Sequence, residues 1–517
     1  MSYYSRLAAN TLQSSLALLK RTENHIDMEK HCDIVENEKF GRYLIANKDL
    51  DAGEIIFADT PFVFGPKPDT PPLCLACYCP VEKTLCSRCG WPICSEACEK
   101  AEQHQAECDV FLGAKVKFQP PEDWSAPSPQ LDCITPLRML IAKEKNPDRW
   151  QRELDVMETH TDERIKRPSW EADQNNIVNF LINHCELGTK FNHDLLQKIC
   201  GILAVNAVEI PSRGGFSSRA IYPYLAIAAH NCVPNIIHSI QYDDLTVLVR
   251  AAVPIKSGEA LYLSYTHALS PTIIRREYLL ESKYFNCECQ RCADSTELGT
   301  HLSTIKCSKC DNGVILSSNP LDSEAQWNCT DKNCGFKTSA AAMRKMLTVI
   351  QTEVDQLDSL EPGPLAIEQR EAFINKYKSV FHPRHSVLLS VKYTLAELYG
   401  RVEGYTIDEL PDLMLERKVE MCRLVLNTLD VILPGDTRMR GMMLYELHAP
   451  LMYLARSEFG SGFLIKEQLK DKLREPLQCL ADAARILQRE DPQSPEGIIG
   501  NIAYQSMEQL KLSLETL

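Results

Sequence analysis

The most constraining feature of this 517-residue sequence is a run of cysteine and histidine residues between positions 74 and 108. They form four close pairs: Cys74-x2-Cys77, Cys86-x2-Cys89, Cys94-x3-Cys98 and His104-x3-Cys108. Thiolate and imidazole ligands in groups of four suit tetrahedral zinc, so eight ligands predict two closed sites. A segment of 35 residues is too short to build a hydrophobic core, so we expect metal ions to replace one. Closed sites have no open coordination position, which favours a structural role over catalysis.

The chain has 22 cysteines, and their interpretation depends on the cellular compartment. Residues 1–19 lack the compact apolar stretch and small-residue cleavage site of a secretory signal. Without an oxidising compartment, paired cysteines indicate metal sites rather than disulfides. The first 22 residues contain Arg6, Lys20 and Arg21 and no acidic residue, a pattern shared by mitochondrial transit peptides and short solvated helices. We favour the helix, and we expect a cytoplasmic or nuclear protein.

Composition narrows the class of protein further. Hydrophobic residues make up 44% and charged residues 24% of the chain, as in folded globular proteins. The length suggests about three domains, and no apolar run approaches the roughly 20 residues of a membrane helix. The formal net charge of −14 argues against strong direct nucleic-acid binding and is compatible with a basic protein substrate.

Two further cysteine groups follow in the second half of the chain. Cys287-x-Cys289-x2-Cys292 offers three thiolates in six residues and needs a fourth ligand. Cys307-x2-Cys310 and Cys329-x4-Cys334 resemble a small zinc ribbon, with a hairpin expected between the two pairs. Chance pairing of cysteines is the alternative in so cysteine-rich a chain. We favour zinc for this group.

Hydrophobic patterning divides the rest of the chain. Alternating or β-branched runs predict short strands in 31–66 and 201–267. Helical spacing of apolar residues marks 134–200 and everything after about 340. We expect the last segment to pack as an antiparallel helical array that closes one wall of the substrate cleft. The alternative is a separate domain on a flexible linker at 362–364.

Two motifs carry a resemblance to a known family. Residues 229–235 read Ala-His-Asn-Cys-Val-Pro-Asn, and residues 258–265 read Gly-Glu-Ala-Leu-Tyr-Leu-Ser-Tyr. Together with the cysteines at 287–292, they resemble the SET domain of protein-lysine methyltransferases. The segment 74–108 matches a MYND finger. A MYND finger inserted between the N-terminal strands and the rest of the SET domain identifies the chain as similar to the SET and MYND domain family. Tyr222-Pro223 and the run Gly-Trp-Pro-Ile-Cys look closest to its arthropod branch.

The resemblance implies an α+β fold: a SET-domain β-fold with an inserted MYND finger and a helical insert, followed by an all-α, tetratricopeptide-like domain. The expected segments are an N-terminal extension (1–30), the SET N-terminal part (31–73), the MYND finger (74–108), the helical SET insert (109–200), the SET core (201–269), the post-SET zinc loop (270–295), the zinc ribbon (303–337) and the helical C-terminal domain (340–517).

The resemblance also assigns roles to residues. It implies methyl transfer from S-adenosylmethionine to a lysine of a protein substrate, with Tyr265 catalytic. The residues that match cofactor-binding positions are Gly41, Arg42, Asn206, His230, Asn231 and Phe285. Cys232 becomes the fourth post-SET ligand, and four zinc ions are expected in all. In the finger, ligand pairs one and three hold one ion, and pairs two and four hold the other. The implied partners are a lysine-bearing protein substrate and proline-rich peptides at the finger, and we expect a monomer.

Three departures from the family pattern bear on activity. Ala229 replaces an asparagine, Tyr43 replaces the second glycine of a turn, and Lys283 stands where many members have a tyrosine of the substrate-lysine channel. Tyr284 is a partial substitute for that tyrosine. Losing one hydrogen bond costs about 0.5–1.5 kcal/mol, which weakens binding without abolishing it. We therefore expect an active methyltransferase. The alternative is a weak or inactive SET-fold scaffold or corepressor that binds partners through the finger and the helical tail.

Overall fold

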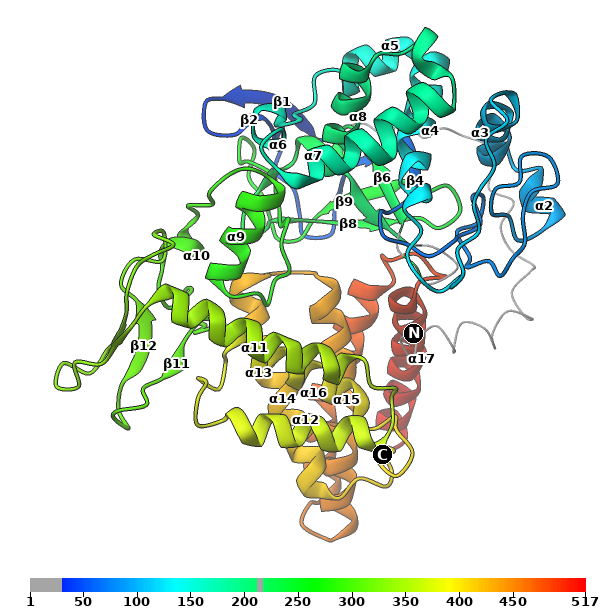
Figure 1. Cartoon of the computed structure of the whole chain (residues 1–517). Coiled ribbons are helices and arrows are strands. Elements are labelled where there is room, and N and C mark those ends of the chain that lie inside the picture. Colours follow the sequence, from blue (N-terminus) through cyan, green and yellow to red (C-terminus); the bar gives the residue numbers. More distant parts are fainter. Residues whose placement is uncertain (1–29, 212–215, 217) are drawn as a thin grey trace.

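The computed structural model describes residues 30–211, 216 and 218–517, so the predicted N-terminal helix lies outside the described residues. Figure 1 shows short strands and the insert helices gathered above a bundle of long C-terminal helices. The finger lies at one side of the strands, and the ribbon hairpin lies at the other side. This arrangement is the α+β fold predicted from the sequence.

The first half of the chain alternates short strands with helices. Its strands are β1 (Cys32–Asn37), β2 (Gly41–Ala46), β3 (Ile55–Asp59), β4 (Val63–Pro66), β5 (Val208–Ile210), β6 (Ser218–Ile221), β7 (Ala229–His230), β8 (Ile236–Ile240), β9 (Val247–Ala251) and β10 (Tyr262–Leu263). Its helices are α2 (Glu96–Glu99), α3 (Glu102–Gly113), α4 (Ile134–Lys145), α5 (Pro147–Arg149), α6 (Thr161–Arg164), α7 (Pro168–Asp173) and α8 (His193–Asn206). Short 3-10 and π-helical turns connect the insert helices.

The strands form small sheets rather than one large one. β1 and β2 form an antiparallel hairpin, β3-β9-β8 and β4-β6-β5 are three-stranded antiparallel sheets, and β7 pairs with β10 in parallel. The parallel pair aligns Ala229 with Tyr262 and His230 with Leu263. It therefore brings the two motifs of the sequence side by side, although about 30 residues separate them.

The finger is not a free-standing unit. Trp91 is fully buried, and its ring stacks on Phe111 with centroids 4.0 Å apart. Both rings belong to one hydrophobic core with insert residues such as Leu137 and Leu196. Zinc therefore does not have to replace the whole core of this segment, contrary to expectation, because the helical insert supplies part of it.

The second half contains the ribbon and the helical tail. The elements are α9 (Thr272–Ser282), α10 (Gln290–Ala293), β11 (Ile305–Lys306), β12 (Val314–Ser317), β13 (Trp327–Cys329), β14 (Lys337–Thr338), α11 (Ala340–Asp358), α12 (Pro364–Tyr377), α13 (Ser386–Leu398), α14 (Asp412–Ile432), α15 (Arg438–Gly460), α16 (Lys466–Leu487) and α17 (Pro495–Thr516). β11 to β14 form a four-stranded antiparallel sheet in sequence order. Apolar faces of the tail helices share one core with the ribbon residues Ile315 and Trp327.

The tail docks on the β8–β9 hairpin and the loops beside it. Arg438 Nη2 donates to the His238 carbonyl at 3.0 Å, and the Asp436 amide donates to the Ala252 carbonyl at 3.0 Å. Gly435 has a φ of +84°, and an added Cβ would lie only 1.9 Å from the Ala252 oxygen. Only glycine therefore fits this close approach. These contacts contradict the picture of a flexibly tethered domain.

Candidate active site and metal centres

Four sets of side chains have the geometry of zinc ligands. They are Cys74, Cys77, Cys94 and Cys98; Cys86, Cys89, His104 and Cys108; Cys232, Cys287, Cys289 and Cys292; and Cys307, Cys310, Cys329 and Cys334. Within each set the ligand atoms lie within 4.8 Å of one another. A tetrahedron with Zn–S bonds of about 2.3 Å has edges of about 3.8 Å. The Sγ atoms of Cys232 and Cys287 are 3.9 Å apart, and those of Cys310 and Cys329 are 3.6 Å apart, as such a site requires.

The structure thus brings together all sixteen side chains singled out in the sequence, in the expected pairings. All the described cysteines are free thiols, so none of these sets is held by a disulfide. Cys232 joins the post-SET group from a segment more than 50 residues away, which spacing alone does not reveal. Cys79 belongs to none of the four sets.

A buried acid orients the histidine ligand of the finger. His104 Nε2 lies 3.7 Å from Cys89 Sγ, and its Nδ1 lies 3.4 Å from Glu107 Oε1. Arg138 Nε and Nη2 donate to the two oxygens of that carboxylate at 2.7 and 2.9 Å. A carboxylate on the far nitrogen fixes the tautomer of a metal-binding histidine, so Glu107 directs Nε2 toward the ion. Arg138 comes from the insert and ties it to the finger.

A buried network of charges surrounds the post-SET set. Arg275 Nε lies 3.3 Å from Cys232 Sγ, and its Nη1 donates to Glu297 Oε2 at 2.7 Å. Arg291 Nε donates to the same oxygen at 3.0 Å. Burial raises the pKa of Glu297, but the two guanidinium groups outweigh it and lower that pKa to about 2. Two cations thus offset the negative charge that four thiolates would place around a divalent ion.

Metal analysis of the purified protein is expected to find four zinc ions per chain. Cys307→Ser should reduce the content to about three, because three remaining thiolates hold zinc far more weakly than four. Cys79→Ser is the matched control, since this finger thiol lies outside the four sets, and it should leave the zinc content unchanged. Two or fewer equivalents in the unmodified protein would contradict the four-ion assignment.

A large cavity near the two motifs has a volume of about 1220 Å³. It is bounded by β1–β2, the end of α8, β5–β6, the β7–β10 pair and the loop after α9. All seven residues expected to carry catalysis or cofactor binding line it: Gly41, Arg42, Asn206, His230, Asn231, Tyr265 and Phe285. The tail residues 340–517 form no part of its described lining, so the tail does not wall this cavity; that it walls the wider cleft for a protein substrate stays a prediction.

Tyr265 is fixed at both its backbone and its side chain. Its hydroxyl donates to the Ala228 carbonyl at 2.6 Å, and its amide donates to His230 Nδ1 at 3.0 Å. Because a backbone N–H can only donate, Nδ1 of His230 accepts and the ring proton sits on Nε2. That Nε2 lies 3.3 Å from Cys232 Sγ. His230 therefore connects the post-SET ligand set to Tyr265. Burial raises the pKa of Tyr265 to about 12, so its hydroxyl stays protonated at neutral pH.

The expected cofactor-binding residues present different groups to the cavity. Asn206, at the end of α8, uses its Nδ2 to donate to the Glu158 and Ile202 carbonyls at 2.9 and 3.1 Å. Its Oδ1 has no hydrogen bond to any described residue. Phe285 and His230 place their rings 5.8 Å apart. Gly41 has a φ of +62°, and an added Cβ would meet nothing within 4 Å. The backbone at Gly41 is therefore open to a ligand.

The three residues that depart from the family pattern occupy this region differently. The Tyr43 ring packs 5.4 Å from Phe40, and Tyr43 is not part of the cavity lining. Lys283 does line the cavity: its Nζ donates to the Val205 carbonyl and lies 5.7 Å above the Tyr265 ring. Burial lowers the pKa of Lys283. Ala229 also lines the cavity, so the cavity wall lacks the side-chain amide of the asparagine that it replaces.

Tyr284 does not lie where a tyrosine of the substrate-lysine channel was expected. It has a φ of +62°, and its ring packs 4.9 Å from His160 and beneath the Arg167 guanidinium. It is absent from the cavity lining, so it does not substitute for the missing channel tyrosine. The left-handed turn at Tyr284 directs its neighbours Lys283 and Phe285 to the cavity instead.

Sequence reasoning missed Asn235 as a structural link at the site. Its Nδ2 donates to the Ala260 carbonyl at 2.8 Å, and its Oδ1 accepts from the Tyr262 amide at 2.7 Å. Asn235 thereby holds the segment before Tyr265 against the segment of His230. The signal available in the sequence was that Asn235 is the last residue of the first motif.

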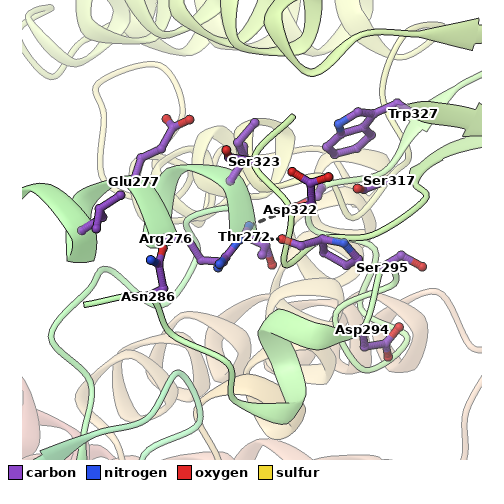
Figure 2. Close-up of a pocket in the computed structure, with 14 residues that line it drawn as sticks. Thr272, Arg276, Glu277, Asn286, Asp294, Ser295, Ser317, Asp322, Ser323 and Trp327 are labelled. Carbon is purple, nitrogen blue, oxygen red and sulfur yellow. Dashed lines mark hydrogen bonds between the residues drawn. The ribbon is translucent and has the colours of Figure 1, made fainter. Parts of the chain in front are cut away.

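A second and much smaller pocket lies between α9 and the ribbon (Figure 2). Its volume is about 60 Å³, and Thr272, Arg276, Ser317 and Trp327 are among its lining residues. Asn286 lines both this pocket and the large cavity. Arg276 Nη1 donates to the Pro320 carbonyl at 3.0 Å and so closes the pocket on one side. Its size suits a few water molecules rather than a cofactor.

Comparisons with known proteins agree with this geometry. The SET domain family matches residues 41–266. The chain is similar to the fruit-fly "SET domain-containing protein SmydA-8, isoform A", with 33% identity over 56% of this chain and 62% of that protein. It is also similar to human "N-lysine methyltransferase SMYD2" (28% identity, 42% and 49% coverage) and to the fission-yeast "SET domain and MYND-type zinc finger protein 6" (26% identity, 58% and 60% coverage). The matched regions thus span about half to two thirds of these relatives.

A solved structure, "Crystal structure of the SET domain of LSMT bound to Lysine and AdoHcy", aligns with 95% of this chain and 90% of that one. The identity is 13% and the TM-score 0.33, so this likeness adds nothing to the assignment. Among the described residues, no helix has both the length and the apolar character to cross a bilayer. Residues 41–266 thus match the SET domain family, and the insect relative and the four ligand sets make the chain similar to proteins of the SET and MYND domain family.

Proposed function

We propose that this protein is an S-adenosylmethionine-dependent protein-lysine methyltransferase. The observation that carries the proposal is the gathering of seven residues, Tyr265 among them, from segments between Gly41 and Phe285 around one cavity. The similarity to an N-lysine methyltransferase supports the same chemistry. Ionisable groups with shifted pKa values in a large cleft are typical of active sites. Burial raises the pKa of Tyr265 and lowers that of Lys283 in this cavity.

The residues present fit the cofactor. The open backbone at Gly41 leaves room for a ligand, and the Asn206 Oδ1 is an acceptor suited to an ammonium group. The Phe285 ring offers an apolar face for an adenine. The cavity, at about 1220 Å³, is larger than the roughly 300–1,000 Å³ of a usual ligand site, which leaves space for a target lysine as well.

S-adenosylmethionine, when bound, supplies a methyl group on a positively charged sulfur. The chain has to present a neutral amine to that group, whereas a free lysine has a pKa near 10.4 and is almost wholly protonated at neutral pH. Burial in the cavity disfavours the charged form, as it does for Lys283. The Tyr265 hydroxyl, held by Ala228, and the carbonyl groups at the end of α8 are positioned to orient the amine.

Calorimetric titration with S-adenosylmethionine and S-adenosylhomocysteine tests the proposal. Asn206→Ala and Phe285→Ala are each expected to raise the cofactor Kd about fivefold or more, since each loses roughly 1 kcal/mol of hydrogen bonding or ring packing. Tyr43→Phe is the control, because this ring lies outside the cavity lining, and it should leave the Kd unchanged. Equal affinity in all three variants would show that the cofactor binds elsewhere.

The scaffold function is the second candidate, and the same titration separates the two. A protein that gives no heat with either ligand would be a SET-fold scaffold rather than an enzyme. The finger is available under both functions, and its binding of proline-rich peptides is a proposal that rests on the family resemblance. Titration of the full chain with such peptides, with and without chelation of zinc, tests that binding separately.

A further inference from the structure

Lys283 is the lysine that lies beside Tyr265 in the cavity. It follows the last residue of α9, and the turn at Tyr284 holds it facing the cavity. Its Nζ donates to the carbonyl of Val205, the residue before Asn206, and lies 5.7 Å above the Tyr265 ring. The amine therefore sits between the expected catalytic residue and an expected cofactor-binding residue.

The other lysines of the cavity lining are placed differently. Lys67 Nζ donates to Glu209 Oε2 at 2.6 Å, and its side chain is 39% exposed. Lys39 lies at the exposed turn between β1 and β2. The structure gives Lys283 a neutral carbonyl as its hydrogen-bond partner, and burial lowers its pKa. Lys283 is thus the lining lysine best suited to become a neutral amine.

We propose that Lys283 is itself a methyl acceptor, modified within its own chain at the site that the protein uses for its substrates. This inference rests on the proposed function. The lone pair of the Lys283 Nζ forms the new N–C bond as the C–S bond of the sulfonium breaks. The electron pair of the broken bond stays on sulfur in S-adenosylhomocysteine, and the proton lost from the methylated amine goes to water.

The first test measures Lys283 without any methyl transfer. The ligand-free protein is treated with trace acetic anhydride at neutral pH, and acetylation of each lysine is quantified by peptide mass spectrometry. Lys283 is expected to be labelled and to be protected about fivefold or more by S-adenosylhomocysteine, because both occupy the same cavity. Lys256, whose side chain is 74% exposed, is the reference and should be unaffected by the ligand. Absence of labelling at Lys283, or labelling without protection, would overturn the inference.

The second test uses S-adenosylmethionine with a deuterated methyl group, so that new methylation is distinguished from any already present. The label is expected on Lys283 and not on Lys67, at a rate per chain that does not change on dilution. A tagged Tyr265→Phe chain mixed with the unmodified protein should stay unlabelled at Lys283, because the amine is reached only from its own cavity. Labelling of the tagged chain at the same rate would contradict modification within one chain.

A library of lysine peptides added to the same reaction separates the two proposals. If the cofactor binds and the library is methylated while Lys283 is not, the inference about Lys283 fails and the proposed function stands. If S-adenosylhomocysteine does not bind and neither Lys283 nor the library is methylated, the proposed function fails and the inference fails with it.

Discussion

Replacing Tyr265 by phenylalanine is expected to lower the turnover of methyl transfer by about 10²-fold or more, a loss typical of removing one preorganised group. The hydroxyl of Tyr265 is held at 2.6 Å from the Ala228 carbonyl, and its backbone is fixed by His230. The substitution removes one oxygen atom from this arrangement and leaves the ring in place. Affinity for S-adenosylhomocysteine should therefore be retained, and calorimetry measures it beside the methylation rate.

Tyr262→Phe is the matched control for this experiment. Tyr262 also lines the cavity and lies on the neighbouring strand β10, but its hydroxyl has no hydrogen bond to any described residue. Its loss should change turnover only slightly. If Tyr265→Phe methylates at the rate of the unmodified protein while binding cofactor normally, Tyr265 has no part in the chemistry. Loss of both binding and turnover would instead point to a collapse of the cavity.

The zinc-ligand sets could be predicted because the sequence spacing within each ligand pair largely determines which side chains lie together. A pair such as Cys86-x2-Cys89 lies in one turn, so its two thiolates face the same point whatever the rest of the fold does. Cys232 is different, since its approach to Cys287 depends on how distant segments cross. Only the similarity of the whole motif to a known family predicted that contact.

Tertiary packing could not be anticipated in the same way. The amphipathic helices after residue 340 predicted an array, but nothing in their pattern told which face of the SET domain they would meet. The contact is made by Gly435 against Ala252 and by Arg438 against the His238 carbonyl, two local details of loops and helix ends. The burial of Trp91 in a core shared with the insert likewise depends on residues far along the chain.

The departures from the family pattern have unequal consequences in the structure. Tyr43 lies within β2, where its ring packs on Phe40, and it forms no part of the cavity lining. Lys283 remains in the wall and replaces a phenol with an amine. A sequence comparison treats these as two changes of the same kind. In the structure they differ because Tyr43 packs on Phe40, whereas the turn at Tyr284 places Lys283 in the cavity wall.

Glu297→Gln is expected to destabilise the segment from α9 to α10 by about 3–5 kcal/mol, the usual result of removing one partner of a buried ion pair. Glu297 is 1% exposed and accepts from both Arg275 and Arg291. A neutral amide removes the carboxylate counter-charge that the two buried guanidinium groups share and turns an N–H donor toward other donors. Amide hydrogen exchange in residues 272–297 measures the local free energy of opening.

The matched control is Glu277→Gln on the same helix α9, which breaks the pair with Arg344 of α11. The side chains of that pair are 35% and 27% exposed, so its loss should cost about 1 kcal/mol or less. Because Arg275 also contacts Cys232, which His230 links to Tyr265, Glu297→Gln should in addition speed the release of one zinc ion to a chelator. Equal stability and equal zinc release in the two variants would mean that the charges around Glu297 do not support the post-SET site.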